Sequence, residues 1–246
     1  MTEVTLSNPL TIEERLQIPR LIEHDSITYF AILLNMPIRS TEFDKEKYEA
    51  IIQHLGSVEQ TIDFLTQSPD INFEDVYSAC RLDKRTITDL LSRVDKILHK
   101  GRLEASVGDI DTFLSYKHLM HTVLFNFIKN SLNAQLGTND GDEDLKVNVA
   151  YSKFPENSVF IPDGARDYTN FVVFNFHNKG RGFPKDIPLK EYFTRTVPER
   201  GASGFGLYFT KLAAKVLRAP INIVSEPGDT TVSFYHPVYV GLKPKV

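Results

Sequence analysis

Three asparagines recur at helical spacing in the middle of the chain. In the segment NFIKNSLN (126–133), Asn126, Asn130 and Asn133 stand at positions i, i+4 and i+7 and therefore share one face of a helix. Amide oxygens can complete the coordination of Mg²⁺, a hard cation that prefers oxygen ligands and usually keeps phosphate and water ligands as well. This face predicts a place where a phosphate-bound magnesium ion is held.

Two glycine-rich segments follow the asparagines. The first, FVVFNFHNKGRGFP (171–184), is an apolar strand that runs into Asn178, Gly180 and Gly182. Glycines let the main chain approach a flat base closely, and a polar side chain just before them can recognise an adenine edge. The second, GASGFGLYFTKLAAKVL (201–217), is a glycine turn that opens a helix, whose free main-chain N–H groups can receive phosphates. Both segments predict a nucleotide ligand.

The N-terminal part has the pattern of two long helices. Residues 11–36 and 43–67 show helical rather than alternating periodicity, and only a few residues connect them. Apolar residues of the second run recur three and four positions apart: Ile51, Leu55, Val58, Ile62 and Leu65. The pattern predicts an antiparallel helical hairpin as a first domain, residues 1–70. Because two helices cannot enclose a core, we expect a second copy to complete a four-helix bundle in a homodimer.

A turn in SPDINFE (68–74) marks the boundary with a second domain, residues 71–246. Helical periodicity there predicts helices over 86–99, 111–136 and 206–217. Alternation predicts strands over 102–107, 145–152, 170–177, 221–225 and 231–236. The mixture predicts an α+β fold, a sandwich with helices on one face of a mixed sheet.

Composition excludes several classes of protein. Hydrophobic residues make up 41% of the 246 residues and charged residues 24%, which excludes a wholly disordered chain. A net charge of -4 gives no general field for nucleic acid or an anionic membrane. The one cysteine, Cys80, cannot form an internal disulfide. The most apolar stretch of the first quarter of the chain, 29–38, is far shorter than the ~20 residues that span a bilayer. We expect a cytoplasmic protein with no membrane span and no nucleic-acid partner.

In this order, the segments resemble the ATP-binding domain shared by histidine kinases, gyrase, Hsp90 and MutL. The 126–133 helix is similar to its asparagine box, NKGRG (178–182) to its first glycine box and GASGFGL (201–207) to its second. KEYFTRTVPERG (190–201) resembles its lid, and INIVSEPGDTTVSFYHP (221–237) resembles the closing hairpin of the histidine-kinase branch. The resemblance covers about residues 86–238. It implies ATP and Mg²⁺ as cofactors, with Asn130 as the metal ligand, Asn178 at the adenine, and Gly204 and Gly206 beside the phosphates.

Two positions depart from the family pattern. The family usually has an aspartate where this chain has Asn178, and a neutral amide oxygen is a weaker acceptor for the adenine amino group by about 1 kcal/mol. The usual lysine after the asparagine box is replaced by Asn133. Lys129, Arg195 or Arg200 would then have to balance the phosphate charge.

The first predicted helix carries a candidate phosphoacceptor. His24 lies on its polar stripe in the segment HDSIT (24–28), which resembles the phosphoacceptor motif of histidine-kinase dimerisation domains. Asp25 can hold the imidazole tautomer or take its proton, which frees a ring nitrogen to attack the ATP γ-phosphate. Thr28, one turn later, can position water for the reverse, phosphatase reaction. The basic residue and the proline of the family motif are missing, and Ile27 stands at the basic position.

The order of the two domains is that of a histidine-kinase catalytic core without a sensor. The expected function is autophosphorylation on His24 from Mg-ATP and transfer of the phosphoryl group to an aspartate on a response-regulator receiver domain. Any signal would come from a separate sensor protein or act on the core itself. One alternative is a histidine phosphotransferase that relays phosphate between receivers without using ATP. Another is a serine or protein kinase of the same ATP fold, such as an anti-sigma factor.

Overall fold

The computed structural model describes residues 10–11, 13–14, 45–66, 80–98, 103–135, 145–193 and 205–238. The predicted phosphoacceptor segment with His24, Asp25 and Thr28 lies outside these residues. None of the helices in the described part of the chain is long and apolar enough to cross a membrane.

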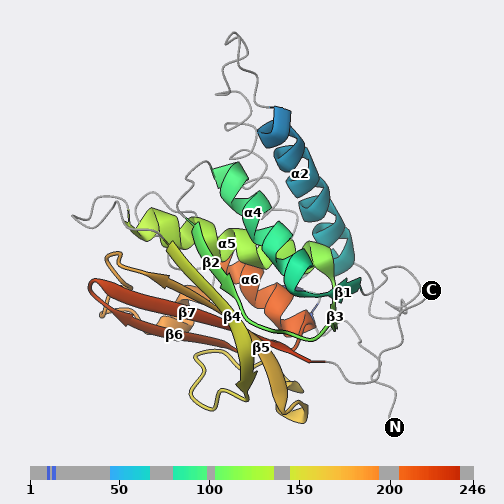
Figure 1. Cartoon of the computed structure of the whole chain (residues 1–246). Helices are drawn as coiled ribbons and strands as arrows, with labels where there is room; N and C mark the ends of the chain where they lie inside the picture. Colours follow the sequence, from blue (N-terminus) through green and yellow to red (C-terminus); the bar gives the residue numbers. More distant parts are fainter. Residues whose placement is uncertain are drawn as a thin grey trace.

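A five-stranded mixed sheet forms one layer of the fold (Figure 1). Its order is β2-β4-β5-β7-β6, in which β2 pairs with β4 in parallel and every other neighbouring pair is antiparallel. The strands are β2 (Leu103–Val107), β4 (Leu145–Lys153), β5 (Asn170–Asn178), β6 (Ile221–Glu226) and β7 (Asp229–Pro237). The five strands coincide with the stretches in which the sequence alternates, which confirms the predicted mixed sheet.

Three helices cover one face of this sheet (Figure 1): α4 (Lys84–Leu98), α5 (Lys117–Gln135) and α6 (Phe205–Val216). The sheet and α5 meet through aromatic side chains, with the ring of Phe127 5.1 Å from Phe176 and 6.2 Å from Phe234. All three rings are buried. Burial of this much apolar surface fixes α5, and therefore its asparagines, against the sheet.

The predicted start of the 111–136 helix is wrong. Residues Phe113–Ser115 form a short strand, β3, which pairs antiparallel with β1 (Cys80–Leu82), and α5 begins only at Lys117. The strand forms because Phe113 and Leu114 are buried against the rest of the core. This contact between distant segments prevails over the local helical pattern.

Helix α2 (Lys45–Thr66) lies over α4 and α5 on the side away from the sheet (Figure 1). Ile51 is fully buried and belongs to the same core as α5, and the hydroxyl oxygens of Thr61 and Thr122 are 3.2 Å apart. This face of α2 is thus covered within one chain. The predicted division near residue 70 and the dimeric four-helix bundle stay predictions.

A short N-terminal segment also contacts the sheet-covering layer. Leu10 is buried in the core, and Thr11 and Glu14 exchange hydrogen bonds between side chain and main chain at a helix start. The Nζ atom of Lys215 on α6 donates to both Glu14 carboxylate oxygens, at 2.9 and 2.8 Å. Glu14 is therefore fixed to α6.

Candidate functional site

The asparagine face of α5 meets the first turn of α6. Asn126 is buried, and its Nδ2 donates to the main-chain oxygen of Thr122 at 3.0 Å. A Cβ atom added to Gly206 would lie 2.9 Å from Asn126 Oδ1 and 3.7 Å from Asn130 Nδ2. Only glycine at position 206 lets the two helices approach this closely.

The three asparagines differ in exposure along α5. Asn126 is buried, Asn130 is half-buried and Asn133 is exposed. The shared face therefore runs from the core to the surface, and Asn130 lies between the two beside Gly206. Its roles as metal ligand and phosphate neighbour remain predictions.

The first glycine segment forms a tight loop at the end of β5. Asn178, the last residue of the strand, is 3% exposed, and its Oδ1 accepts the main-chain N–H of Gly180 at 2.9 Å. A Cβ atom on Gly180 would lie 2.6 Å from the main-chain oxygen of Ala134, and Arg181 N–H donates to that same oxygen at 3.3 Å. The loop is thus packed against the C-terminal part of α5.

The closing hairpin holds the other side of this loop. The N–H of Gly228, in the β6–β7 turn, donates to Gly180 O at 3.0 Å, and Phe183 N–H donates to Ser225 Oγ at 2.8 Å. Gly182 has a φ of 74°, a main-chain conformation that residues with a side chain rarely adopt. A Cβ atom there would lie 2.9 Å from Ser225 Oγ. The glycine loop, the C-terminal part of α5 and the β6–β7 hairpin are therefore held together by hydrogen bonds and close contacts.

Thr230 is a site residue that the sequence analysis missed. It is the register partner of Asn178 across β5 and β7, is 3% exposed, and its Oγ1 lies 3.0 Å from Ser225 Oγ. Directly opposite residues in an antiparallel pair place their side chains on the same face. The alternation of the closing hairpin could have identified this hydroxyl, had its register against β5 been known.

Helix α5 connects the two ends of the site. Asn126 contacts the start of α6, and Ala134, eight residues later and roughly 12 Å along the helix axis, contacts the glycine loop. The donor set fits a magnesium nucleotide: amide oxygens suit Mg²⁺, and the main-chain N–H groups at the start of α6 suit phosphates. Among the described residues, no group of three or more His, Cys, Asp or Glu could hold a metal ion by itself.

Two neutral histidines lie at the contact between α2 and α5. The His54 ring of α2 stacks on Phe125 at 4.1 Å and meets His121 edge-on at 4.9 Å. Burial lowers the pKa of His121 to about 4 and that of His54 well below its ordinary value, with the charge of Lys129 also lowering the latter. The predicted role of Lys129 in balancing phosphate charge stays a prediction.

Of the remaining predicted segments, the structure describes only the start of the lid. His24, Asp25, Thr28, Gly204 and Arg200 lie outside the described residues, as does Arg195. The described start of the predicted lid, Leu189–Phe193, is a 3₁₀ turn in which Phe193 is buried. Tyr192 packs edge-on against Phe183 of the glycine segment, with ring centroids 4.8 Å apart. The start of the lid thus packs against the glycine segment.

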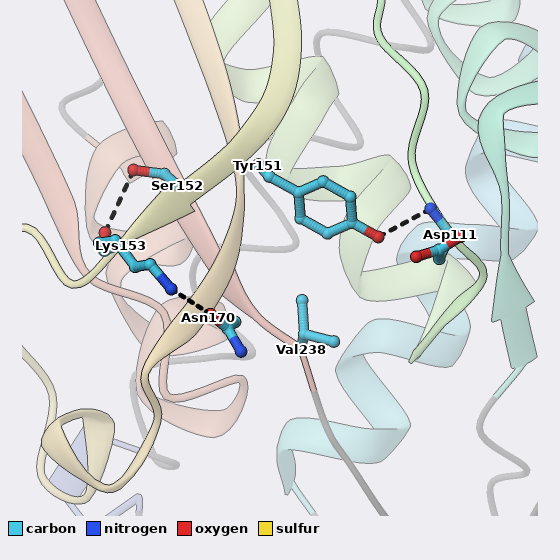
Figure 2. A pocket seen from close by; sticks show the side chains of 6 residues that line it. All are labelled: Asp111, Tyr151, Ser152, Lys153, Asn170 and Val238. Carbon is cyan, nitrogen blue, oxygen red and sulfur yellow. Dashed lines mark hydrogen bonds between the residues drawn. The ribbon is translucent and has the colours of Figure 1, made fainter.

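A separate open depression lies at the other end of β5 (Figure 2). Tyr151 Oη there accepts the N–H of Asp111 at 2.7 Å, and Lys153 Nζ donates to Asn170 Oδ1 at 2.8 Å. Asn170 begins the strand that Asn178 ends, so the two places are roughly 26 Å apart at ~3.3 Å per residue. The depression holds none of the predicted site residues.

Comparison with known proteins agrees with this geometry. No curated protein matches the chain. The family model described as histidine kinase-, DNA gyrase B-, and HSP90-like ATPase matches residues 116–240, just over half of the chain. The match begins at the residue before α5 and ends just after β7, and so includes the asparagine face, the glycine loop, the start of α6 and the closing hairpin. The chain belongs to the family of histidine kinase-, DNA gyrase B- and HSP90-like ATPases.

Proposed function

We propose that this protein is a histidine kinase that phosphorylates His24 from Mg-ATP and passes the phosphoryl group to an aspartate of a response-regulator receiver domain. The family to which the chain belongs is shared by kinases, gyrase and Hsp90 and gives the ATP-binding fold. The HDSIT segment gives the acceptor. Gyrase- or Hsp90-like chemistry would leave that segment without a use.

The observation that carries the proposal is the meeting of Asn126, Asn130 and Gly206 at the start of α6. This contact brings two amide groups to the helix end at which phosphates are best received. The glycine loop, held by Ala134 and by the closing hairpin, supplies the opposite, base end of the same site. In this proposal, one elongated ligand with a base and a chain of phosphates extends from one end to the other.

The transfer is a simple displacement at phosphorus. A ring nitrogen of His24 attacks the γ-phosphorus, a nitrogen–phosphorus bond forms, and the bond to the bridging oxygen breaks to release ADP. Asp25 takes the proton that the phosphorylated imidazole loses. Mg²⁺, held through Asn130 when bound, would offset negative charge on the phosphates. In the second transfer the receiver aspartate forms an acyl phosphate as the nitrogen–phosphorus bond breaks, and the ring nitrogen takes a proton back from Asp25 or water, which restores neutral His24.

The proposal includes a homodimer in the cytoplasm. Since α5 covers the face of α2 that carries Ile51, pairing with a second copy would use residues 11–36 and the opposite side of α2, where Ile52 is 46% exposed. Two chains would then supply the four helices of a bundle, of which one hairpin has only two.

One observation favours a second candidate, a histidine phosphotransferase that relays phosphate without ATP. Asn178 replaces the acidic residue expected at the adenine, and its oxygen already accepts a hydrogen bond from Gly180. Such a site would bind ATP weakly or not at all. The two candidates share His24 as the phosphorylated residue and differ only in the phosphate donor.

Labelling with γ-³²P-ATP and with a phosphorylated receiver tests both candidates. A kinase takes label from ATP, whereas a phosphotransferase takes it only from the receiver. In either case the label should be acid-labile and base-stable, should disappear in His24→Ala, and should persist in the matched control Ser26→Ala. Label that survives in His24→Ala, or that resists acid as a serine ester does, would refute both and favour the serine-kinase alternative.

A further inference from the structure

The amide of Asn178 has a fixed orientation. A main-chain N–H can only donate, so the Asn178 atom that lies 2.9 Å from Gly180 N must be the oxygen, Oδ1. The other branch of the amide is then Nδ2, with two N–H groups. The structure thus determines which end of the side chain offers donors.

The Asn178 side chain is only 3% exposed, and the loop engages it through Oδ1. A ligand atom that accepts from Nδ2 would gain a hydrogen bond there. Asn178 lies at the base end of the site, where β5 enters the glycine loop and pairs with Thr230 of β7. The hydroxyl of Thr230 can either donate or accept and so does not select between bases.

We propose that Asn178 lets this site accept 6-oxopurine nucleotides, such as GTP and ITP, as well as ATP; this inference rests on the proposed nucleotide site. The Nδ2 N–H groups match the carbonyl oxygen at position 6 of a guanine or hypoxanthine base. The 6-amino group of adenine is a donor. It must use the lone pair of Oδ1 that the hydrogen bond from Gly180 N–H leaves free. An aspartate would present only acceptors and would favour adenine.

Titration calorimetry with Mg-ATP, Mg-GTP and Mg-ITP on the full chain tests the inference. The wild-type Kd values for ATP and GTP should lie within about 10-fold of each other, and ITP should follow GTP because it shares the 6-oxo group but lacks the 2-amino group. Asn178→Asp should shift the preference toward ATP by about 10- to 100-fold, the size of one matched hydrogen-bonding pair. Asn130→Ala, at the phosphate end, should weaken all three nucleotides by the same factor.

The wild-type ratios decide the matter even if Asn178→Asp does not fold. A preference for ATP over both GTP and ITP of 100-fold or more would overturn the inference and leave the kinase proposal intact. An unchanged ratio in a folded Asn178→Asp would overturn it as well. Binding of none of the three nucleotides would overturn both this inference and the use of ATP in the proposed function.

Discussion

Acidification should weaken the contact between α2 and α5, because two neutral histidines meet there. His54 and His121 are both buried, with ring centroids 4.9 Å apart. Burial, aided by the charges of Arg93 and Lys117, lowers the pKa of His121 to about 4. Burial, then repulsion from His121 when that ring is protonated and from the charge of Lys129, holds the pKa of His54 well below its ordinary value. Protonation of either ring would place a charge in this core.

The magnitude follows from the difference in pKa between the folded and unfolded states. An unfolded histidine titrates near 6.5 and folded His121 near 4, so the unfolded chain binds more protons between these values. The stability due to neutral His121 is fully present above pH 6.5 and is lost as the pH falls toward 4. At pH 5 the loss from His121 alone is about 2 kcal/mol of unfolding free energy relative to pH 8.

Urea unfolding at pH 8 and pH 5 measures this loss. His121→Gln keeps a polar side chain of similar length but does not titrate, so wild type should lose about 2 kcal/mol more than the variant between the two pH values. Ile52→Gln, on the exposed side of α2, should keep the wild-type pH dependence. Equal losses in wild type and His121→Gln would refute the assignment of a buried, neutral histidine at this contact.

Two further substitutions test the packing that positions the site. Gly180→Ala should lower the unfolding free energy by about 1–3 kcal/mol because its Cβ would lie 2.6 Å from Ala134 O. Gly56→Ala in α2 should raise the unfolding free energy by about 0.5–1 kcal/mol, because a Cβ there would have nothing within 4 Å. Thermal unfolding in which both substitutions shift stability in the same direction would contradict the geometry. Lys215→Met should cost about 1–2 kcal/mol because the half-buried Glu14 carboxylate loses two hydrogen bonds, and a urea double-mutant cycle with Glu14→Gln should recover part of that cost.

Regular elements were predictable because their patterns are local. The spacing of Asn126, Asn130 and Asn133 within an apolar run indicates a helix, and α5 carries all three. The alternation of the closing segment likewise predicts the β6–β7 hairpin. Strands β1 and β3 were missed because three residues are too few to show alternation and the two segments are far apart in the sequence.

Contacts between distant segments could not be predicted from one sequence. An apolar stripe such as that of Ile51 can be buried by a second copy or by α5 of the same chain, and its periodicity is the same in both cases. The meeting of His54 with His121 depends on the same helix packing. Similarly, the asparagine at 178 is visible in the sequence, but the direction of its amide is set by Gly180 N–H within the folded loop.

Calorimetric titration of the purified chain with ATP, in Mg²⁺ and in EDTA, tests the central claim most directly, namely that α5, the glycine loop and α6 form one magnesium-nucleotide site. Binding of ATP should require Mg²⁺. Asn130→Ala should weaken the affinity for ATP by about 10-fold or more through loss of a metal ligand. Asn133→Ala, at the exposed end of the same face, should change the affinity less. Absence of heat and of competition at millimolar ATP, or equal binding by wild type and Asn130→Ala, would contradict the account.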